Sequence, residues 1–169
     1  MRKIIVGLMF LVGFCAMAQG VNRTGSKVSV KDANKFMEHH NLVRKEVGVP
    51  NLSWNVKLAK VAQKYANTLA SKKCTLKHSH NPKYGENLFM GHGVVYTALD
   101  ASKAWYTEKR MYSYSKIGYN NYQAVGHYTQ MIWKNTTEVG VGVAICKDGG
   151  YIFVANYFPK GNYIGKYPY

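Results

Sequence analysis

The sequence is poor in acidic residues, and this scarcity limits the partners that the protein can have. Eight Asp and Glu stand against 23 Lys and Arg, which gives a formal net charge of +15 at pH 7. A surplus of this size favours anionic surfaces, such as acidic lipid headgroups or a cell-wall polymer, through long-range attraction. The basic residues are scattered along the chain and form no cluster, so the pattern does not favour a nucleic-acid partner.

Long apolar runs are missing beyond the first residues. The one apolar run, Ile4 to Met17, follows Arg2 and Lys3 and is shorter than the roughly 20 residues that a membrane-spanning helix needs. Ala16-Met17-Ala18 has the small-x-small pattern of a cleavage site, so residues 1–18 are predicted to be a secretory signal peptide. The protein is therefore expected to be secreted and to have no transmembrane segment.

Internal repeats and low-complexity tracts are also lacking, which favours a single ordinary domain. Residues 19–31 are mostly small or polar and contain glycine, so they are predicted to be a flexible leader. The remaining stretch, residues 32–169, is long enough to bury a core of its own.

Cysteine is scarce as well. Signal-peptide cleavage removes Cys15 and leaves Cys74 and Cys146. In an oxidising compartment the two most simply form one disulfide, which would stabilise the fold by roughly 4 kcal/mol for a loop of about 70 residues. The alternative is a pair of buried free thiols.

Hydrophobic spacing predicts an α+β domain. Apolar positions three and four apart indicate helices, with Asn55 as an N-cap of the second and Thr97 and Asp100 in a capping-box pattern at the start of the third. Alternation indicates two strands joined by a glycine turn, which form a hairpin. Helices that cover an antiparallel sheet are the expected architecture. The predicted helices are 32–47, 55–69 and 97–108, and the strands 138–146 and 151–158.

Three polar residues stand within or directly beside apolar patterns. His127 lies beside the apolar face of a short helix, Glu108 continues the buried stripe of the third helix, and Glu86 directly precedes the run Asn87-Leu88-Phe89. A buried carboxylate is costly unless a cation, a donor or a metal satisfies it. The ordinary alternatives are a satisfied core histidine, a helix end that bends into water and a strand-edge charge. His40 is interpreted as a hydrogen-bonded core residue.

Four segments of the chain stand out together: Gly126 to Thr136, Tyr84 to Leu88, His40-Asn41 with Arg44, and Tyr151 to Asn162. They resemble the signature segments of the CAP superfamily, which groups cysteine-rich secretory proteins, antigen-five allergens and plant pathogenesis-related proteins of the first class. The resemblance covers residues 32–169 and implies an α-β-α sandwich with a central antiparallel sheet flanked by helices. The plant-type relatives that the chain most resembles have three disulfides, whereas Cys74 and Cys146 correspond to one pair.

The resemblance also implies a cleft that holds His78, Glu86, Glu108 and His127, with Zn²⁺ or another divalent metal at the two histidines. This ligand set is chemically reasonable for zinc, although no short motif such as HExxH is present.

The resemblance further implies a secreted binding protein of the defence or host-interaction type, with a sterol, a fatty acid or another lipid as ligand. The tyrosine-rich loop at 112–125 and the segment 130–136 are the expected contact regions, although half-buried tyrosines in a core lid would give the same pattern. The candidate ligand-binding residues are Tyr112, Tyr114, Tyr119, Tyr122, Gln130 and Trp133.

Two alternatives to a binding protein remain open. One is a metal-assisted hydrolase, a protease or an esterase, in which zinc activates water and Glu86 or Glu108 acts as base. The sequence assigns no catalytic residue, so binding is favoured over catalysis. The other is a precursor whose C-terminal segment, residues 159–169, is released as a signalling peptide, as proposed for plant relatives with a similar C-terminal pattern.

Overall fold

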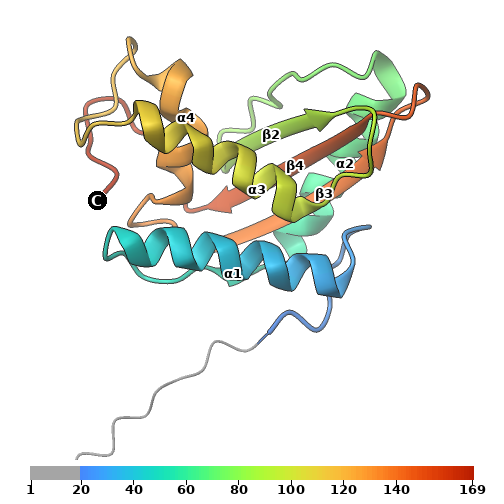
Figure 1. The fold of residues 1–169 in the computed structure, drawn as a ribbon, viewed down its shortest axis with the longest axis horizontal. Coiled ribbons are helices and arrows are strands. Elements are labelled where there is room, and N and C mark those ends of the chain that lie inside the picture. Colours follow the sequence, from blue (N-terminus) through green and yellow to red (C-terminus); the bar gives the residue numbers. More distant parts are fainter. Residues whose placement is uncertain (1–19) are drawn as a thin grey trace, which may run out of the picture.

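The computed structural model describes residues 20–169, so the predicted signal peptide lies outside the described residues. The described chain forms a four-stranded sheet in the order β1-β3-β4-β2 with helices on both faces (Figure 1). The strands are β1 (Ser53–Trp54), β2 (Gly85–Gly91), β3 (Glu138–Ile145) and β4 (Tyr151–Phe158). The helices are α1 (Val30–Glu46), α2 (Val56–Lys72), α3 (Ala98–Tyr106), the 3₁₀ helix η1 (Thr107–Met111) and α4 (Tyr122–Met131).

The sheet separates two hydrophobic cores, which makes the fold an α-β-α sandwich, as the resemblance implied. On one face, Phe36 of α1, Trp105 of α3 and Tyr128 of α4 pack with Val139 and Phe153. On the other face, Ala62, Ala66 and Leu69 of α2 pack with Val154 and Ile152. No described helix is long and apolar enough to cross a membrane.

Two glycines of β3 let α2 approach the sheet closely. A Cβ atom at Gly140 would meet the backbone of Ala59, and one at Gly142 would meet the backbone of Gln63. Because backbone cannot move aside as a side chain can, these positions need glycine. The close approach fixes α2 over the hairpin.

The helix starts follow the predicted caps. Asn55 accepts hydrogen bonds from Lys57 N and Leu58 N, and Thr97 and Asp100 form the expected capping box. The third helix differs from the prediction at its other end, because α3 stops at Tyr106 and Glu108 lies in the 3₁₀ turn that follows. This turn redirects the chain towards α4.

The sheet contains one pairing that the sequence pattern did not indicate. β3 and β4 form the predicted antiparallel hairpin, and β2 pairs antiparallel with β4. The two-residue β1 instead pairs parallel with β3, which makes the sheet mixed. A strand of two residues carries no readable alternation, so its pairing is visible only in three dimensions.

The predicted flexible leader is packed against the domain. Trp54 Nε1 donates to Thr24 O at 3.0 Å, and Lys27 N donates to Gln63 Oε1 at 2.8 Å. Val28 is buried, and α1 already begins at Val30 with a cap from Ser29. The side chains of Trp54 and Gln63 thus anchor the backbone of a segment whose mostly small or polar residues do not predict packing.

The two remaining cysteines form the predicted disulfide. Cys74 and Cys146 are bonded, with their Cα atoms 5.8 Å apart. The bond joins the residues just after α2 to the end of β3, so it fixes one end of the molecule.

Candidate functional site

The first polar pair of the site joins the loop after α2 to the start of β2. His78 Nδ1 lies 2.8 Å from Glu86 Oε1, and Ser79 N donates to the same oxygen at 2.8 Å. The Glu86 side chain is 8% exposed, whereas that of His78 is 47% exposed. Burial acts to raise the pKa of Glu86, but the hydrogen bonds from His78 and Ser79 outweigh it and lower the pKa overall. Glu86 is therefore an ionised, largely buried carboxylate.

The second oxygen of this carboxylate has no partner. Glu86 Oε2 is buried and accepts no hydrogen bond from the described residues. A buried acceptor without a donor costs free energy, so such an atom calls for a cation, a water or a ligand donor. Glu86 lines a cavity of about 210 Å³. Its other wall residues include His78, Ser79, Tyr84, Tyr122, Gln130, Lys160, Gly161 and Asn162.

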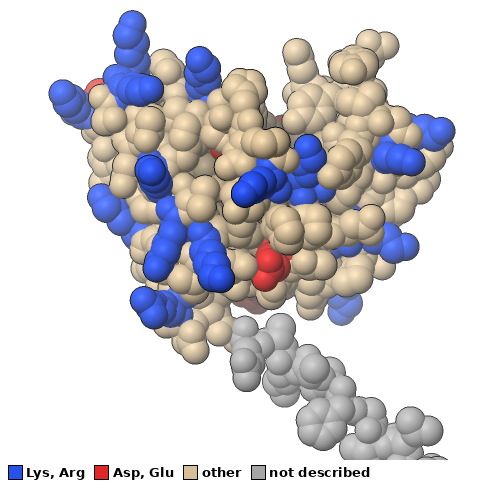
Figure 2. Space-filling view, turned by 180° about the vertical axis from the view of Figure 1, so that it is seen from behind, with Lys and Arg blue, Asp and Glu red and all other residues tan. Residues whose placement is uncertain are grey.

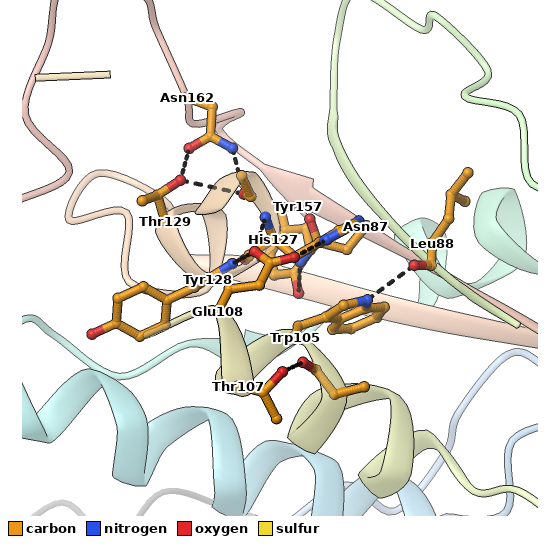
Figure 3. A network of polar contacts seen from close by, with 12 residues as sticks. Asn87, Leu88, Trp105, Thr107, Glu108, His127, Tyr128, Thr129, Tyr157 and Asn162 are labelled. Atoms are coloured by element: carbon orange, nitrogen blue, oxygen red, sulfur yellow. Dashed lines mark hydrogen bonds and ion pairs between the residues drawn. The ribbon is translucent and has the colours of Figure 1, made fainter. Parts of the chain in front are cut away.

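The second polar pair joins η1 to α4 (Figure 3). His127 Nδ1 lies 2.5 Å from Glu108 Oε1, while Glu108 Oε2 accepts from His127 N at 2.9 Å and from Tyr128 N at 3.0 Å. The His127 ring stacks on Trp105, with the ring centroids 6.1 Å apart. The 3₁₀ turn after α3 thus brings Glu108 to α4 and fixes both its oxygens.

Asn87 connects the two pairs. It follows Glu86 in β2, and its Nδ2 donates to His127 O at 3.1 Å and to the Tyr157 hydroxyl at 3.3 Å (Figure 3). Tyr157 in turn contacts His40 Nε2 at 2.9 Å. His40 is fully buried and its pKa lies well below the ordinary value, mainly because burial disfavours the charged imidazole. The interpretation of His40 as a hydrogen-bonded core histidine is confirmed.

The four predicted site residues form two neighbouring pairs rather than one cluster. His127 and Glu108 are not among the residues that line the 210 Å³ cavity. Among the described residues, the only group of three or more potential metal-ligand atoms within 4.8 Å is Cys74, Cys146 and Asp148, and two of these atoms are disulfide sulfurs. No three of the four predicted site residues therefore have ligand atoms within this distance of one another.

The six predicted ligand-binding residues lie in different environments. Gln130 is buried and bonded to Thr136 Oγ1 at 3.1 Å and to Gly161 N at 2.9 Å, and Trp133 is also buried. Tyr112 packs against the ring of Tyr128, and Tyr114 stacks on the C-terminal Tyr167. Tyr122 lines the cavity, and Tyr119 is 85% exposed. The structure thus brings together only Tyr122 and Gln130 at the cavity.

Sequence reasoning missed the wall that the C-terminal segment supplies. Gly161 and Asn162 line the cavity, and the Asn162 side chain bonds to Thr129 Oγ1 at 2.8 Å and to Gly126 O at 2.7 Å (Figure 3). Further along, Lys134 N donates to Pro168 O at 2.7 Å. The segment has neither the periodicity of a helix nor that of a strand. The residues of the segment therefore do not predict where it packs in the fold.

Buried Arg44 holds the segment after α4 in place. Its guanidinium donates to Met131 O, Trp133 O and Thr136 O at 2.9 Å each and to Pro50 O at 2.6 Å. Burial lowers its pKa to about 10, so it stays charged at neutral pH. Arg44 thereby positions the end of α4, which carries the cavity residue Gln130.

The chain is similar to known proteins in sequence and in fold. Residues 37–157 match the family described as the cysteine-rich secretory protein family, CAP. Pathogenesis-related protein 1C of Nicotiana tabacum is 44% identical over 134 residues, 79% of each chain. Pathogenesis-related protein PRMS of Zea mays is 38% identical over 170 residues, which is 99% of this chain and 98% of that protein. A crystal structure of NaASP2 with Zn²⁺ superposes with a TM-score of 0.74 at 29% identity, covering 84% of this chain and 86% of the other.

Proposed function

The chain belongs to the cysteine-rich secretory protein family, and on this premise we propose that it is a secreted protein of the defence type that binds a divalent metal ion, zinc above all, at His78 and His127. Its similarity to plant pathogenesis-related proteins supports the defence role. The observation that carries the metal proposal is the matched pairing of each imidazole with a carboxylate through Nδ1.

This pairing fits the chemistry of a zinc site. A histidine that ligates zinc commonly donates its other ring N–H to a carboxylate, which fixes its tautomer and increases its basicity. Glu86 and Glu108 hold Nδ1 of the two rings, so Nε2 of each is left for the metal. Glu86, which lines the cavity, also has an oxygen, Oε2, that no described residue pairs with. When bound, zinc would supply a Lewis acid, and His78 and His127 would hold it.

Zinc titration of the purified mature chain tests the proposal. Isothermal titration at pH 7.5 is expected to give one binding event that weakens strongly in His78→Ala and in His127→Ala. His92→Ala is the matched control, because His92 is as exposed as His78 but pairs with Asp148 at the other end of the sheet. Binding should also weaken as the pH falls to 5, since a protonated imidazole cannot ligate. Unchanged affinity in either site variant would refute the assignment.

Lipid binding is a second candidate, and a separate groove favours it. The cavity beside Glu86, at about 210 Å³, is smaller than the 300–1,000 Å³ that is usual for small-molecule pockets. A groove of about 690 Å³ lies instead along α1 and the N-terminal segment. Its apolar wall residues are Val21, Met37, Leu42, Leu52, Trp54 and Val56. We infer that a sterol or a fatty acid would bind there rather than at Gln130 and Trp133.

A binding assay with cholesterol and palmitate separates the two locations. Leu42→Arg places a charge in the groove at a side chain that is 56% exposed, so the fold should tolerate it. It is expected to abolish lipid binding, whereas Tyr119→Ala in the tyrosine loop should leave it unchanged. If Tyr119→Ala abolishes lipid binding and Leu42→Arg does not, the ligand binds at the tyrosine loop. If the wild-type chain binds no lipid at micromolar concentration, the lipid proposal is wrong.

The hydrolase alternative receives less support from the geometry. Both oxygens of Glu108 accept hydrogen bonds, three in all, and Glu86 is bonded to His78 and Ser79. A carboxylate held through both oxygens, as Glu108 is, orients an imidazole and leaves less room for a role as general base, whereas Glu86 is held through Oε1 only. Peptide or ester hydrolysis that chelation abolishes and that Glu86→Gln or Glu108→Gln removes would favour the enzyme.

A further inference from the structure

Two loops form one end of the sandwich, opposite the C-terminal segment (Figure 1). Gly91 of β2 and Ile145 of β3 both pair with Tyr151 of β4, so the three strands end at the same level. The loop 92–96 and the turn 146–150 therefore emerge side by side, and His92 Nε2 lies 3.4 Å from Asp148 Oδ2 between them. We call residues 92–96 together with 145–150 the valine tip.

The valine tip exposes apolar side chains that the described chain leaves uncovered. Val94 is 64% exposed, Val95 76% and Ile145 61%. Single exposed apolar residues are ordinary on protein surfaces, but here two consecutive valines and an isoleucine are exposed at the same end of the sandwich. Apolar side chains grouped at one end favour contact with an apolar phase.

The disulfide brings two lysines to this end of the sandwich. Lys73 precedes Cys74 and Lys147 follows Cys146, and both lysines are exposed, so the bond between the two cysteines brings them to the same end. Asp148 is the one acidic residue in the valine tip, and it faces His92. Figure 2 shows several Lys and Arg side chains at the upper left, the end that carries the β3–β4 turn, and others spread over the same face.

We propose that the valine tip docks the protein on anionic lipid bilayers. An acidic polysaccharide would meet the lysines but offers no apolar phase for the valines, and an apolar protein surface would leave the lysines without partners. A bilayer with anionic lipids satisfies both, because apolar side chains enter the acyl boundary while lysines contact headgroups. The net charge of +15 adds long-range attraction. This docking is independent of the metal and lipid proposals above.

The position of the charges gives a sharp first test. Sedimentation measures binding of the mature chain to two kinds of vesicle, one of phosphatidylcholine alone and one with a quarter of phosphatidylglycerol. The wild type is compared with two double variants, Lys73→Gln/Lys147→Gln and Lys57→Gln/Lys60→Gln. Both double variants lose two charges, but Lys57 and Lys60 lie near the other end of α2, about 20 Å away at 1.5 Å per residue. This distance exceeds the Debye length of about 8 Å at physiological salt.

The first double variant is expected to bind anionic vesicles at least tenfold more weakly, at about 1 kcal/mol per lysine near the surface, and the second within about twofold of the wild type. Equal losses in both pairs would mean that net charge alone attracts the protein, and the docking site would be wrong. Equal binding to both kinds of vesicle would also overturn the proposal.

The apolar contact is tested separately. Val94→Ser/Val95→Ser should lower the vesicle affinity about tenfold, because each valine loses apolar area to bury. Val30→Ser/Val61→Ser, at exposed valines on α1 and α2, should not. A tryptophan introduced by Val95→Trp should be quenched by brominated lipids. Absence of quenching, or full vesicle binding by the Val94/Val95 variant, would leave only an electrostatic attraction to polyanions and refute insertion. Thermal unfolding checks that each variant is folded.

Discussion

Replacing Tyr157 by Phe removes one hydroxyl from a buried chain of hydrogen bonds that ends at the candidate site. Asn87 Nδ2 donates to this hydroxyl, so the hydroxyl gives its own proton to His40 Nε2. His40 Nδ1 must then carry the ring proton and donate to Ser102 Oγ at 2.8 Å, which leaves the Ser102 hydroxyl to donate to His39 Nδ1 at 2.7 Å. The chain has a single direction from β2 to the surface of α1.

The expected loss of stability follows from the groups that lose their partners. His40 Nε2 and one Asn87 N–H become unpaired, and both residues are buried. An unsatisfied buried group costs about 1–3 kcal/mol, so Tyr157→Phe should lower the free energy of unfolding by roughly 2–5 kcal/mol. For a domain of this size, this corresponds to a fall in Tm of the order of 5–15 °C.

Urea and thermal unfolding measure the effect against a matched variant. Tyr119→Phe removes a hydroxyl from a side chain that is 85% exposed and should change stability by less than about 0.5 kcal/mol. Nitrogen NMR of the wild-type protein should find the ring proton of His40 on Nδ1. If Tyr157→Phe is as stable as Tyr119→Phe, or if the proton is on Nε2, the directed chain is wrong.

Three further predictions concern the same framework. Because burial lowers the pKa of His40, the unfolded chain takes up a proton that the folded chain does not, so urea unfolding should show stability falling below about pH 6.5 by up to about 1.4 kcal/mol per pH unit, and a flat profile would contradict this. Arg44→Lys leaves at least one of four carbonyls without a donor and should cost about 2–4 kcal/mol in the same assay, whereas exposed Lys45→Gln should cost almost nothing. Cys74→Ser/Cys146→Ser should lower the free energy of unfolding by about 4 kcal/mol, and an equal stability of the wild-type protein with and without reductant would refute this.

The sequence predicts the elements whose signals are local. Asn55 and Thr97 cap their helices as expected, and the alternation in β3 and β4 predicts the hairpin. A helix cap can be recognised from the three residues that follow it, and a strand face from every second residue. Both signals can therefore be detected in a single sequence. The parallel pairing of β1 with β3 and the packing of the N-terminal segment depend on partners far along the chain.

The candidate site is predictable in its residues but not in its arrangement. Glu108 continues an apolar stripe, and His127 and Glu86 stand directly beside apolar segments, so the sequence itself indicates these three, whereas the resemblance alone indicates His78. Each histidine pairs with a carboxylate through Nδ1, and the two pairs are joined by Asn87. This arrangement depends on the turn after α3 and on Asn87, which the sequence pattern does not reveal. The resemblance predicts Gln130 and Trp133 as ligand contacts, but both are buried, and the sequence does not tell that the C-terminal segment covers them.

That covering element links two of the proposed activities. Lys160, Gly161 and Asn162 line the cavity beside Glu86, and Gly161 N is a hydrogen-bond partner of buried Gln130. If residues 159–169 were released as a peptide, Gln130 would lose this partner, Trp133 would lose the cover of Tyr163, and the cavity would lose one wall. Peptide release and binding at the cavity therefore cannot be independent, because the segment that one activity removes is part of the site that the other needs.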